Sequence, residues 1–252
     1  MRAIAGLMSL HSGSISIDGV DMSRTPPNKR GIGLVFQSYA LFPHLNAFEN
    51  VAFGLRIKKF STPEIATRVG KGLTMVGLSH LAERKPQEMS GGQQQRLSLA
   101  RSLVMEPKVL LLDEPLSNLD ARLRLEMRTE LQRVQRDTGI TMIFVTHDQS
   151  EALALADRIV LMKNGVIEQL GTPDDLYNRP TTAFAADFFG FENIFKVSHS
   201  KIIGNGDIAQ TFEHRLSLGA IIALRFARQV GFYAAQPFFC RRFAIVGDNR
   251  GD

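Results

Sequence analysis

The sequence lacks several features that define particular classes of protein. Its 252 residues include one cysteine, Cys240, which excludes an internal disulfide framework and a cysteine-rich metal site. A single thiol also suits a reducing compartment. No segment approaches the roughly 20 consecutive apolar residues that a membrane-spanning helix needs. We therefore expect a globular protein located in the cytoplasm.

An excess of charge of one sign is also absent from most of the chain, because basic and acidic residues nearly balance there. The net charge is +5, and most of it lies in residues 196–252. A basic tail of this kind is usually a solvated segment, so we expect no nucleic-acid partner. Apolar residues make up 44% of the chain, which is ordinary for a protein with a buried core and excludes general disorder.

The apolar pattern predicts an α/β fold. The continuous apolar run 109–112 is typical of a strand that is covered on both faces of a parallel sheet, and 140–145 is predicted as a second buried strand. A charged amphipathic helix is predicted between them, over 121–137, and alternating strands and helices define this fold class. The remaining segments are predicted as strands at 14–17 and 32–36, a hairpin of 158–162 with 166–170, helices at 63–76, 91–105, 151–156, 173–177 and 182–189, and a loop over Pro43–Asn50.

Polar residues follow three of the predicted strands. Asp113 and Glu114 follow the run 109–112, where carboxylates are able to hold Mg²⁺ and to activate a water molecule. Gln37 and His147 follow two other strands. Ligands bind at the carboxyl ends of strands in such sheets, so a site is expected there. Each residue alone has an ordinary alternative, such as a polar turn or a structural histidine.

A glycine pair precedes the helix predicted from residue 91. In Ser90-Gly91-Gly92-Gln93 the glycines let the backbone approach a ligand closely. The N–H groups of the first helical turn favour an anion such as phosphate. A serine N-cap followed by flexible glycines is the alternative interpretation.

The order and spacing of these motifs resemble the ATP-binding subunits of ABC transporters. The resemblance covers roughly residues 1–195 and implies a truncated ABC-type nucleotide-binding domain there, with a parallel RecA-like sheet and a helical subdomain at about 45–105. Residues 196–252 are expected to be a short β-rich piece, either the remnant of a C-terminal β-barrel regulatory domain or a disordered tail, with Ile221–Leu224 as a candidate strand. The motifs that carry the resemblance are Gln37, Ser90–Arg96, Leu110–Pro115, Ser117–Asp120 and Thr146-His147.

The resemblance implies a role for each motif residue. Asp113 would bind Mg²⁺, and Gln37 would touch both the metal and the attacking water. Glu114 would be the general base, and His147 would stabilise the γ-phosphate in the transition state. The residues implied to bind ATP across a dimer interface are Ser90, Gly91, Gly92, Gln93 and Asp120.

The resemblance also implies cofactors and partners. ATP and Mg²⁺ are the expected cofactors, and a second ATP-binding subunit is the expected dimer partner. The segments 39–45 and 49–55 resemble those of importers for polyamines, ferric iron and sugars, so transmembrane permease subunits are expected to dock near Gln37–Leu55. Core packing of these apolar residues is the alternative. The protein would then be peripheral on the inner face of the plasma membrane, and the solute would be chosen by other subunits.

The sequence contains no match to the phosphate-binding motif G-x-x-x-x-G-K-[ST]. In the resembled family that loop stands before a segment like Arg2–Leu7, so we expect the chain to begin just downstream of it. The N–H groups and lysine of that loop cradle the phosphates. We therefore expect weak ATP binding and negligible turnover by this chain alone. We also expect a missing central strand whose neighbours are left unpaired.

Three functions stay open on this evidence. The first is the ATPase subunit of a solute importer. The second is a hydrolysis-deficient partner that lends Ser90–Gln93 to a site on an intact subunit. The third is a defunct, truncated product that folds poorly. A role like that of the DNA-repair relatives is disfavoured, because the long coiled-coil insertion of those proteins is absent.

Overall fold

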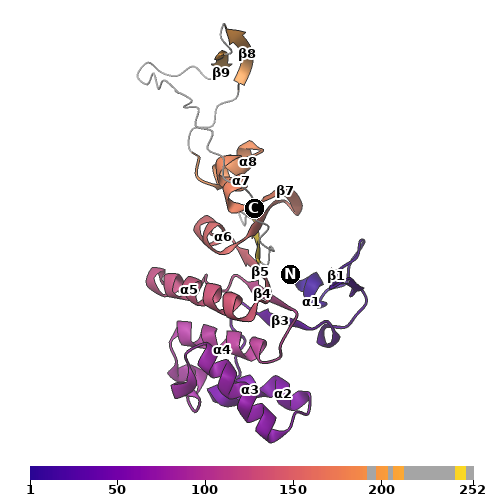
Figure 1. The fold of residues 1–252 in the computed structure, drawn as a ribbon, viewed down its shortest axis with the longest axis vertical. Coiled ribbons are helices and arrows are strands. Elements are labelled where there is room, and N and C mark those ends of the chain that lie inside the picture. The colour runs from indigo at the N-terminus through magenta and orange to yellow at the C-terminus, as the bar shows by residue number, and fades with distance from the viewer. Residues whose placement is uncertain (192–196, 204–206, 213–241, 248–252) are drawn as a thin grey trace.

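A six-stranded sheet organises the protein, for which the computed structural model describes residues 1–191, 197–203, 207–212 and 242–247. The strand order is β3-β4-β5-β10-β6-β7 (Figure 1). Neighbouring strands are parallel from β3 to β6, and only the β6–β7 hairpin is antiparallel within this sheet. The predicted α/β fold with a parallel sheet is thus confirmed. The strands are β3 Ile32–Val35, β4 Val109–Asp113, β5 Thr141–Thr146, β6 Arg158–Lys163, β7 Val166–Gly171 and β10 Arg242–Gly247.

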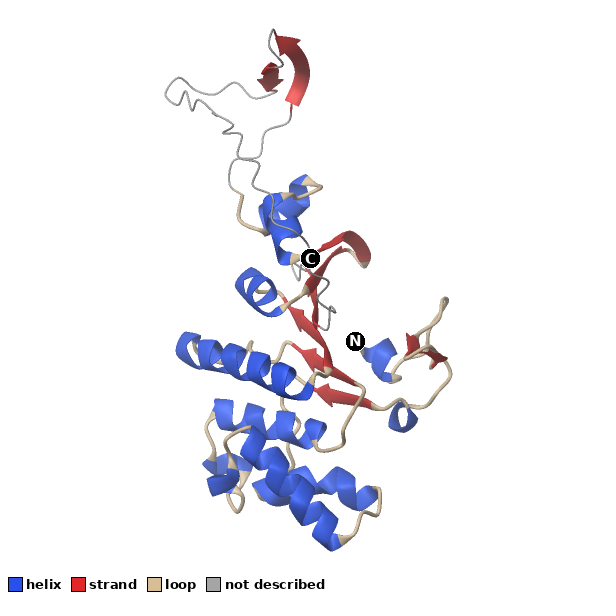
Figure 2. Ribbon diagram, viewed as in Figure 1, coloured by secondary structure: helices blue, strands red, loops and turns tan. Residues whose placement is uncertain are grey.

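Helices lie beside the sheet and in a separate group at one end of the molecule. Helices α5 and α6 lie on one side of the sheet, and α1 lies on the other with the β1–β2 hairpin (Figure 1). Figure 2 shows α2, α3 and α4 grouped together below the sheet. The elements are α1 Arg2–Ala5, β1 Ser16–Ile17, β2 Val20–Asp21, α2 Ala47–Ile57, α3 Thr62–Met75, α4 Gly91–Leu103, α5 Ala121–Thr138, α6 Gln149–Leu155, α7 Pro173–Asn178, α8 Ala183–Phe188, β8 Val197–Ile203 and β9 Asp207–Phe212, with 3₁₀ helices at Pro27–Lys29, Ser79–Leu81 and Pro86–Glu88.

Local capping chemistry sets the ends of the two helices that border the candidate site. At the start of α4 the Gln93 N–H donates to Ser90 Oγ at 3.4 Å, and Gln93 Oε1 accepts the Ser90 N–H at 2.9 Å. At the start of α5 the Asp120 carboxylate accepts the Leu123 N–H at 2.9 Å. Helix α5 ends at Gly139, whose φ of 63° favours glycine. The sequence predicts helix starts at residues 91 and 121, and both are confirmed.

The predicted loop over Pro43–Asn50 is wrong at its carboxyl end. Helix α2 begins at Ala47, because Asn46 caps it by accepting the Glu49 N–H at 2.8 Å. Asparagine was read as a loop residue, although it is among the best helix N-caps. The apolar face of α2, which includes Val51 and Leu55, is buried against the other helices of the group.

The prediction that two sheet strands would be left unpaired is also wrong. Strand β10 comes from the end of the chain and pairs with both β5 and β6. Strands β8 and β9 form a separate antiparallel hairpin. The candidate strand Ile221–Leu224 lies outside the described residues, and the domain boundary near residue 195 stays a prediction.

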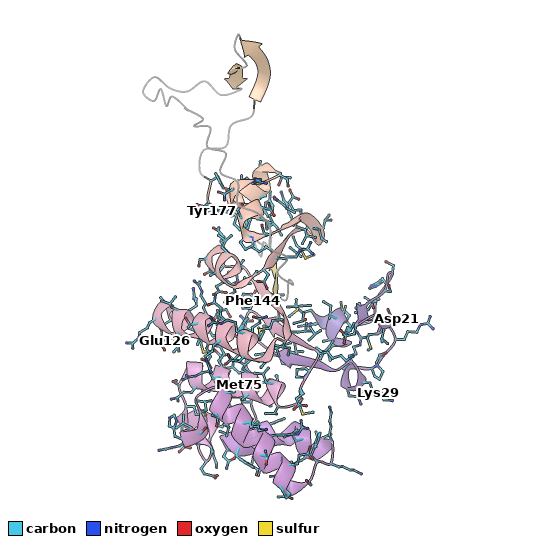
Figure 3. The ribbon with its side chains drawn as sticks, viewed as in Figure 1. Asp21, Lys29, Met75, Glu126, Phe144 and Tyr177 are labelled. Carbon is cyan, nitrogen blue, oxygen red and sulfur yellow. The ribbon has the colours of Figure 1, made fainter. Side chains whose placement is uncertain are left out.

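One hydrophobic core joins the sheet to its helices. The three leucines of β4, Leu110, Leu111 and Leu112, are at most 2% exposed, as expected for a strand that is covered on both faces. Burying each such side chain contributes roughly 1.5–3 kcal/mol. Phe144 of β5 lies deep among the side chains at the sheet, whereas Asp21 and Lys29 extend at the outer edge of the N-terminal segment (Figure 3). The core therefore fixes the strands whose carboxyl ends carry the candidate site.

Candidate functional site

The sheet brings three of the predicted site residues together at the carboxyl ends of β3, β4 and β5. The Gln37 amide nitrogen lies 3.4 Å from one carboxylate oxygen of Glu114. His147 Nδ1 lies 3.5 Å from the other. Glu114 therefore stands between Gln37 and His147. Sequence spacing could not show this arrangement, because Gln37 and Glu114 are 77 positions apart.

The backbone of Glu114 is held in a conformation that residues other than glycine rarely adopt. Its φ is 44°, in the left-handed region. The Glu114 N–H donates to the Val145 carbonyl of the neighbouring strand at 3.0 Å, and the Ser117 hydroxyl donates to the Glu114 carbonyl at 2.9 Å. Such conformations persist only where surrounding structure holds them, and they gather at functional sites. The turn therefore fixes where the Glu114 carboxylate leaves the sheet.

Residues after β4 also hold the residue that follows β3. The Gln37 amide donates to Ser117 Oγ at 3.0 Å, and the Asn118 side chain donates to the Gln37 carbonyl at 3.1 Å. These contacts fix Gln37 from both its side chain and its backbone. Ser117 and Asn118 belong to one of the sequence motifs, but their contact with Gln37 depends on the fold.

A buried polar network lies behind His147. Thr146 Oγ1 donates to the Glu151 carboxylate at 2.7 Å, and the Arg124 guanidinium approaches both Asp148, at 3.4 Å, and Glu151, at 3.6 Å. Arg124 also donates to the Leu119 carbonyl at 3.2 Å. The network therefore connects the turn before α5 with the turn that carries His147. A cavity of about 40 Å³ lies between these groups and Glu114.

Charge within this network is set by burial and hydrogen bonds. Burial raises the pKa of Glu151, and the hydrogen bond from Thr146 offsets part of that effect. Burial opposes ionisation of Asp148 as well, but hydrogen bonds from Ser150 and from the Glu151 N–H, together with Arg128, lower its pKa. The motifs of the sequence do not indicate this network. The spacing of Asp148 and Glu151, three positions apart at a helix start, is the signal that would have indicated a capping interaction.

The predicted phosphate-binding residues at the start of α4 pack against the start of α5. A Cβ atom on Gly92 would lie 2.8 Å from Leu123 Cδ1, and one on Gly91 would lie 3.7 Å from Leu119 Cδ2. The glycine pair therefore packs against the turn that contains Asp120. Across the part of the chain that the structure describes, no hydrogen bond links Ser90–Gln93 to Gln37, Glu114 or His147.

Asp113 ends β4 directly before Glu114 and pairs in register with Val145. It is half-buried. Among the described residues, no group of three or more His, Cys, Asp and Glu side chains is placed to hold a metal ion. Asp113, Glu114 and the Gln37 amide nonetheless offer oxygen ligands at one edge. That set suits Mg²⁺, which uses one or two carboxylates together with water and phosphate oxygens.

Comparison with known proteins places this geometry in a family. Residues 1–117 match the ABC transporter family. The chain is 49% identical over 213 residues to the spermidine/putrescine import ATP-binding protein PotA of Borreliella afzelii (strain PKo), across 84% of this chain and 61% of that protein. It is 54% identical over 194 residues to the Fe(3+) ions import ATP-binding protein FbpC 1 of Rhizobium meliloti (strain 1021), across 77% of this chain and 55% of that protein. The chain therefore spans about three-fifths of the length of these curated relatives.

The fold agrees with a solved relative. The structure of cbiO1 from Clostridium perfringens, described as part of the ABC transporter complex cbiONQ, matches with a TM-score of 0.66 and 34% identity, across 71% of this chain and 73% of that chain. Fold and sequence together define an ABC-type ATP-binding domain. The chain belongs to the family of ABC transporter ATP-binding proteins, which confirms the resemblance seen in its motifs. None of the helices in the described part is long and apolar enough to cross a membrane.

Proposed function

We propose that this chain is an ATP-binding subunit of an ABC importer, which couples ATP binding and hydrolysis to transport of a solute. The observation that carries the proposal is the contact of Gln37 and His147 with Glu114 at the carboxyl ends of three parallel strands. Phosphoryl transfer to water needs a positioned water and neutralised phosphate charge more than covalent chemistry. The names of the curated relatives support import, and of polyamines or ferric iron in particular.

Each site residue then has a task that its position supports. Glu114 accepts the proton of the attacking water, while the Gln37 amide beside it orients that water. His147 turns Nδ1 toward Glu114, so Nε2 is the nitrogen that meets a phosphate oxygen. Asp113 and Gln37 would hold Mg²⁺, which when bound would supply neutralisation of the phosphate charge.

A second subunit completes the site in this proposal. Ser90 and Asp120 cap the starts of α4 and α5, and among the described residues no hydrogen bond joins them to Glu114. By the family resemblance, one nucleotide would contact Glu114 of one subunit and the α4 start of the other. The N–H groups at the start of α4 suit the γ-phosphate. Since the sequence contains no G-x-x-x-x-G-K-[ST] segment, a second candidate function is a partner that lends only its α4 start to an intact subunit.

The proposed contact with permease subunits lies on α2 and the segment before it. Phe42 and Phe53 stack with ring centroids 4.4 Å apart, and Phe36 and Phe53 are about two-fifths exposed. Exposed aromatic pairs are typical anchors of protein interfaces. The protein would then bind at the cytoplasmic face of the membrane, where permease subunits present their loops.

The test mixes this chain with a homologous subunit that contains the phosphate-binding motif and measures ATP hydrolysis. Ser90→Arg in this chain is expected to lower the activity that depends on the mixture by roughly 100-fold, because it blocks the N–H groups that face the phosphate. Ser79→Arg, on an exposed 3₁₀ helix, is the matched control and should leave the activity unchanged. No loss with Ser90→Arg would contradict both candidate functions.

Glu114→Gln in the same mixture separates the two candidates. If both composite sites hydrolyse ATP, the substitution removes the general base of one and lowers its turnover by roughly 100-fold or more. If this chain only lends its α4 start, Glu114→Gln leaves the activity unchanged while Ser90→Arg abolishes it.

A further inference from the structure

The last strand that the structure describes, β10, lies in the middle of the sheet. Strand β10 runs parallel to β5, with Ala244 paired to Phe144, and parallel to β6, with Ala244 paired to Ile159. Residues 172–241, 70 in number, separate the end of β7 from the start of β10. The segment is therefore a remote piece of chain inserted between two strands that lie close together in the sequence.

The chemistry of the slot between β5 and β6 explains why a strand is needed there. Without β10, both strands would expose a full row of N–H and C=O groups toward each other, in a region where α6 packs on β5 and β10. Buried parallel strands consist of continuous apolar residues, and residues 243–246, Phe-Ala-Ile-Val, are such a run. Their sequence fits the central position that they occupy.

The slot also borders the candidate site. Val246, near the end of β10, pairs with Thr146, which directly precedes His147. Strand β10 therefore ends at the same edge of the sheet as β4 and β5, where Asp113 and His147 lie. Strand β5, which His147 directly follows, is therefore held by β4 on one edge and by β10 on the other.

We propose that the slot between β5 and β6 is a binding surface for one parallel apolar strand, and that residues 242–247 of the same chain occupy it and close the sheet. The proposal concerns the assembly of the fold and stands independently of ATP hydrolysis. It makes the C-terminal segment a part of the ATP-binding domain. The sequence instead predicts an appendage or tail over 196–252. If that were so, a substitution in residues 242–247 would leave the sheet unchanged.

A matched pair of proline substitutions in the full chain tests the proposal. Ala244→Pro removes a strand N–H in the centre of the sheet, whereas Ala209→Pro makes the same change in β9 of the separate hairpin. Ala244→Pro is expected to raise amide hydrogen exchange over 141–146 and 158–163 by more than tenfold and to lower Tm by on the order of 5–10 °C. Ala209→Pro should leave exchange in both strands unchanged. Unchanged exchange in Ala244→Pro would overturn the proposal.

Disulfide trapping keeps the proposal testable if Ala244→Pro does not fold. Ile245 pairs with Val160 of β6, so Ile245→Cys with Val160→Cys, in a chain with Cys240→Ser, should form an intrachain bond on oxidation. Ile245→Cys with Val166→Cys, on the next strand, is the control and should not. A bond that joins two chains would show that a second copy supplies the strand, and absence of any bond would show that the slot is not filled by this segment; either result rejects the proposal.

Discussion

The Thr146 hydroxyl donates a 2.7 Å hydrogen bond to the carboxylate of Glu151, and both residues are buried. Thr146 ends β5 directly before His147, and Glu151 lies in the first turn of α6. The same hydroxyl accepts the Asp148 N–H at 3.0 Å. One buried hydroxyl therefore joins the strand end, the turn that carries His147 and the helix that follows.

Removal of this hydroxyl should destabilise the fold. We expect Thr146→Val to lower the free energy of unfolding by about 1–3 kcal/mol, because it leaves the Glu151 carboxylate and the Asp148 N–H without this partner. Thr129→Val is the control, since Thr129 is exposed and its hydroxyl bonds the Leu125 carbonyl of its own helix. Its effect should stay within about 0.5 kcal/mol. Urea unfolding followed by circular dichroism measures both, and equal losses would contradict a special role for Thr146.

Glu151 should make stability depend on pH. Its pKa in the folded protein is raised by burial, so the folded state holds this proton at a pH where the unfolded state has released it. The contribution of Glu151 to stability is therefore greatest in acid and declines as pH rises from about 4.5 through the raised pKa of the folded state. We expect Glu151→Gln to remove that decline, because glutamine does not titrate.

A neighbouring carboxylate of opposite behaviour is the control for this measurement. The lowered pKa of Asp148 contributes stability above its ordinary value near 3.8, and that contribution is lost as pH falls. Asp148→Asn should therefore flatten the acid limb of the profile. It should reduce the change above pH 4.5 without removing it, because burial is the largest cause of the raised Glu151 pKa and the Asp148 charge a smaller one. Melting temperatures from pH 3 to 8 test both. A Glu151→Gln profile parallel to that of the unaltered chain above pH 4.5 would show that Glu151 does not titrate there.

The sequence predicts those parts of the fold that depend on local pattern. The apolar run 109–112 indicates β4, and Asn164-Gly165 indicates the β6–β7 hairpin, because period and turn chemistry act over a few residues. The start of helix α2 was predicted as loop because its cap, Asn46, also suits a loop. Strand β10 was missed since nothing in residues 242–247 says which distant strands they pair with.

The candidate site was predictable in its residues and not in its contacts. Order along the chain identified Gln37, Glu114 and His147, since motif spacing is a property of the sequence. Their approach to one another depends on the parallel register of three strands. The partners behind them, such as Arg124, depend on how α5 lies over the turn at residue 148. An arginine in a surface helix such as α5 gives no indication in the sequence of which distant carboxylates it will contact.

Close packing at the start of α4 predicts that Gly92 does not tolerate a side chain. A Cβ atom there would lie 2.8–2.9 Å from three carbon atoms of the Leu123 side chain, so Leu123 or the helix start must move. We expect Gly92→Ala to cost about 1–3 kcal/mol, as other overpacked sites do. Gly70→Ala is the matched control. Gly70 lies within α3 with open space around its Cβ position, so alanine should stabilise the helix by about 0.5–1 kcal/mol.

Opposite signs for these two glycine substitutions are the expected result in thermal unfolding. A gain in stability for both would mean that Leu123 moves aside at little cost. In that case the glycine at residue 92 would not be explained by packing, and the backbone approach of a ligand would be the remaining reason for it.

The aromatic pair of Phe53, on α2, and Phe42, in the segment before it, predicts where a permease subunit binds. Arg101 of α4 donates to the Ala40 carbonyl at 2.7 Å and lies over the Phe42 ring at 5.6 Å from its centroid. Phe42 in turn stacks on Phe53. The exposed rings are therefore held in place by the helical group before any partner arrives. Preorganised aromatic side chains lose little conformational entropy on binding, which favours them as interface anchors.

Truncation of the exposed ring should thus weaken binding more than folding. We expect Phe53→Ala to weaken association with the permease subunits of a PotA-type relative by roughly 30-fold, which corresponds to about 2 kcal/mol. Ile57→Ala, one turn further along α2 and 67% exposed, is the control and should change affinity less than threefold, a change of roughly 0.6 kcal/mol. Titration into nanodiscs that contain the permease subunits measures both affinities, with Tm recorded in parallel. If Phe53→Ala lowers Tm by several degrees and leaves the affinity unchanged, the pair belongs to the core of the helical group, and the permease contact must be sought elsewhere on Gln37–Leu55.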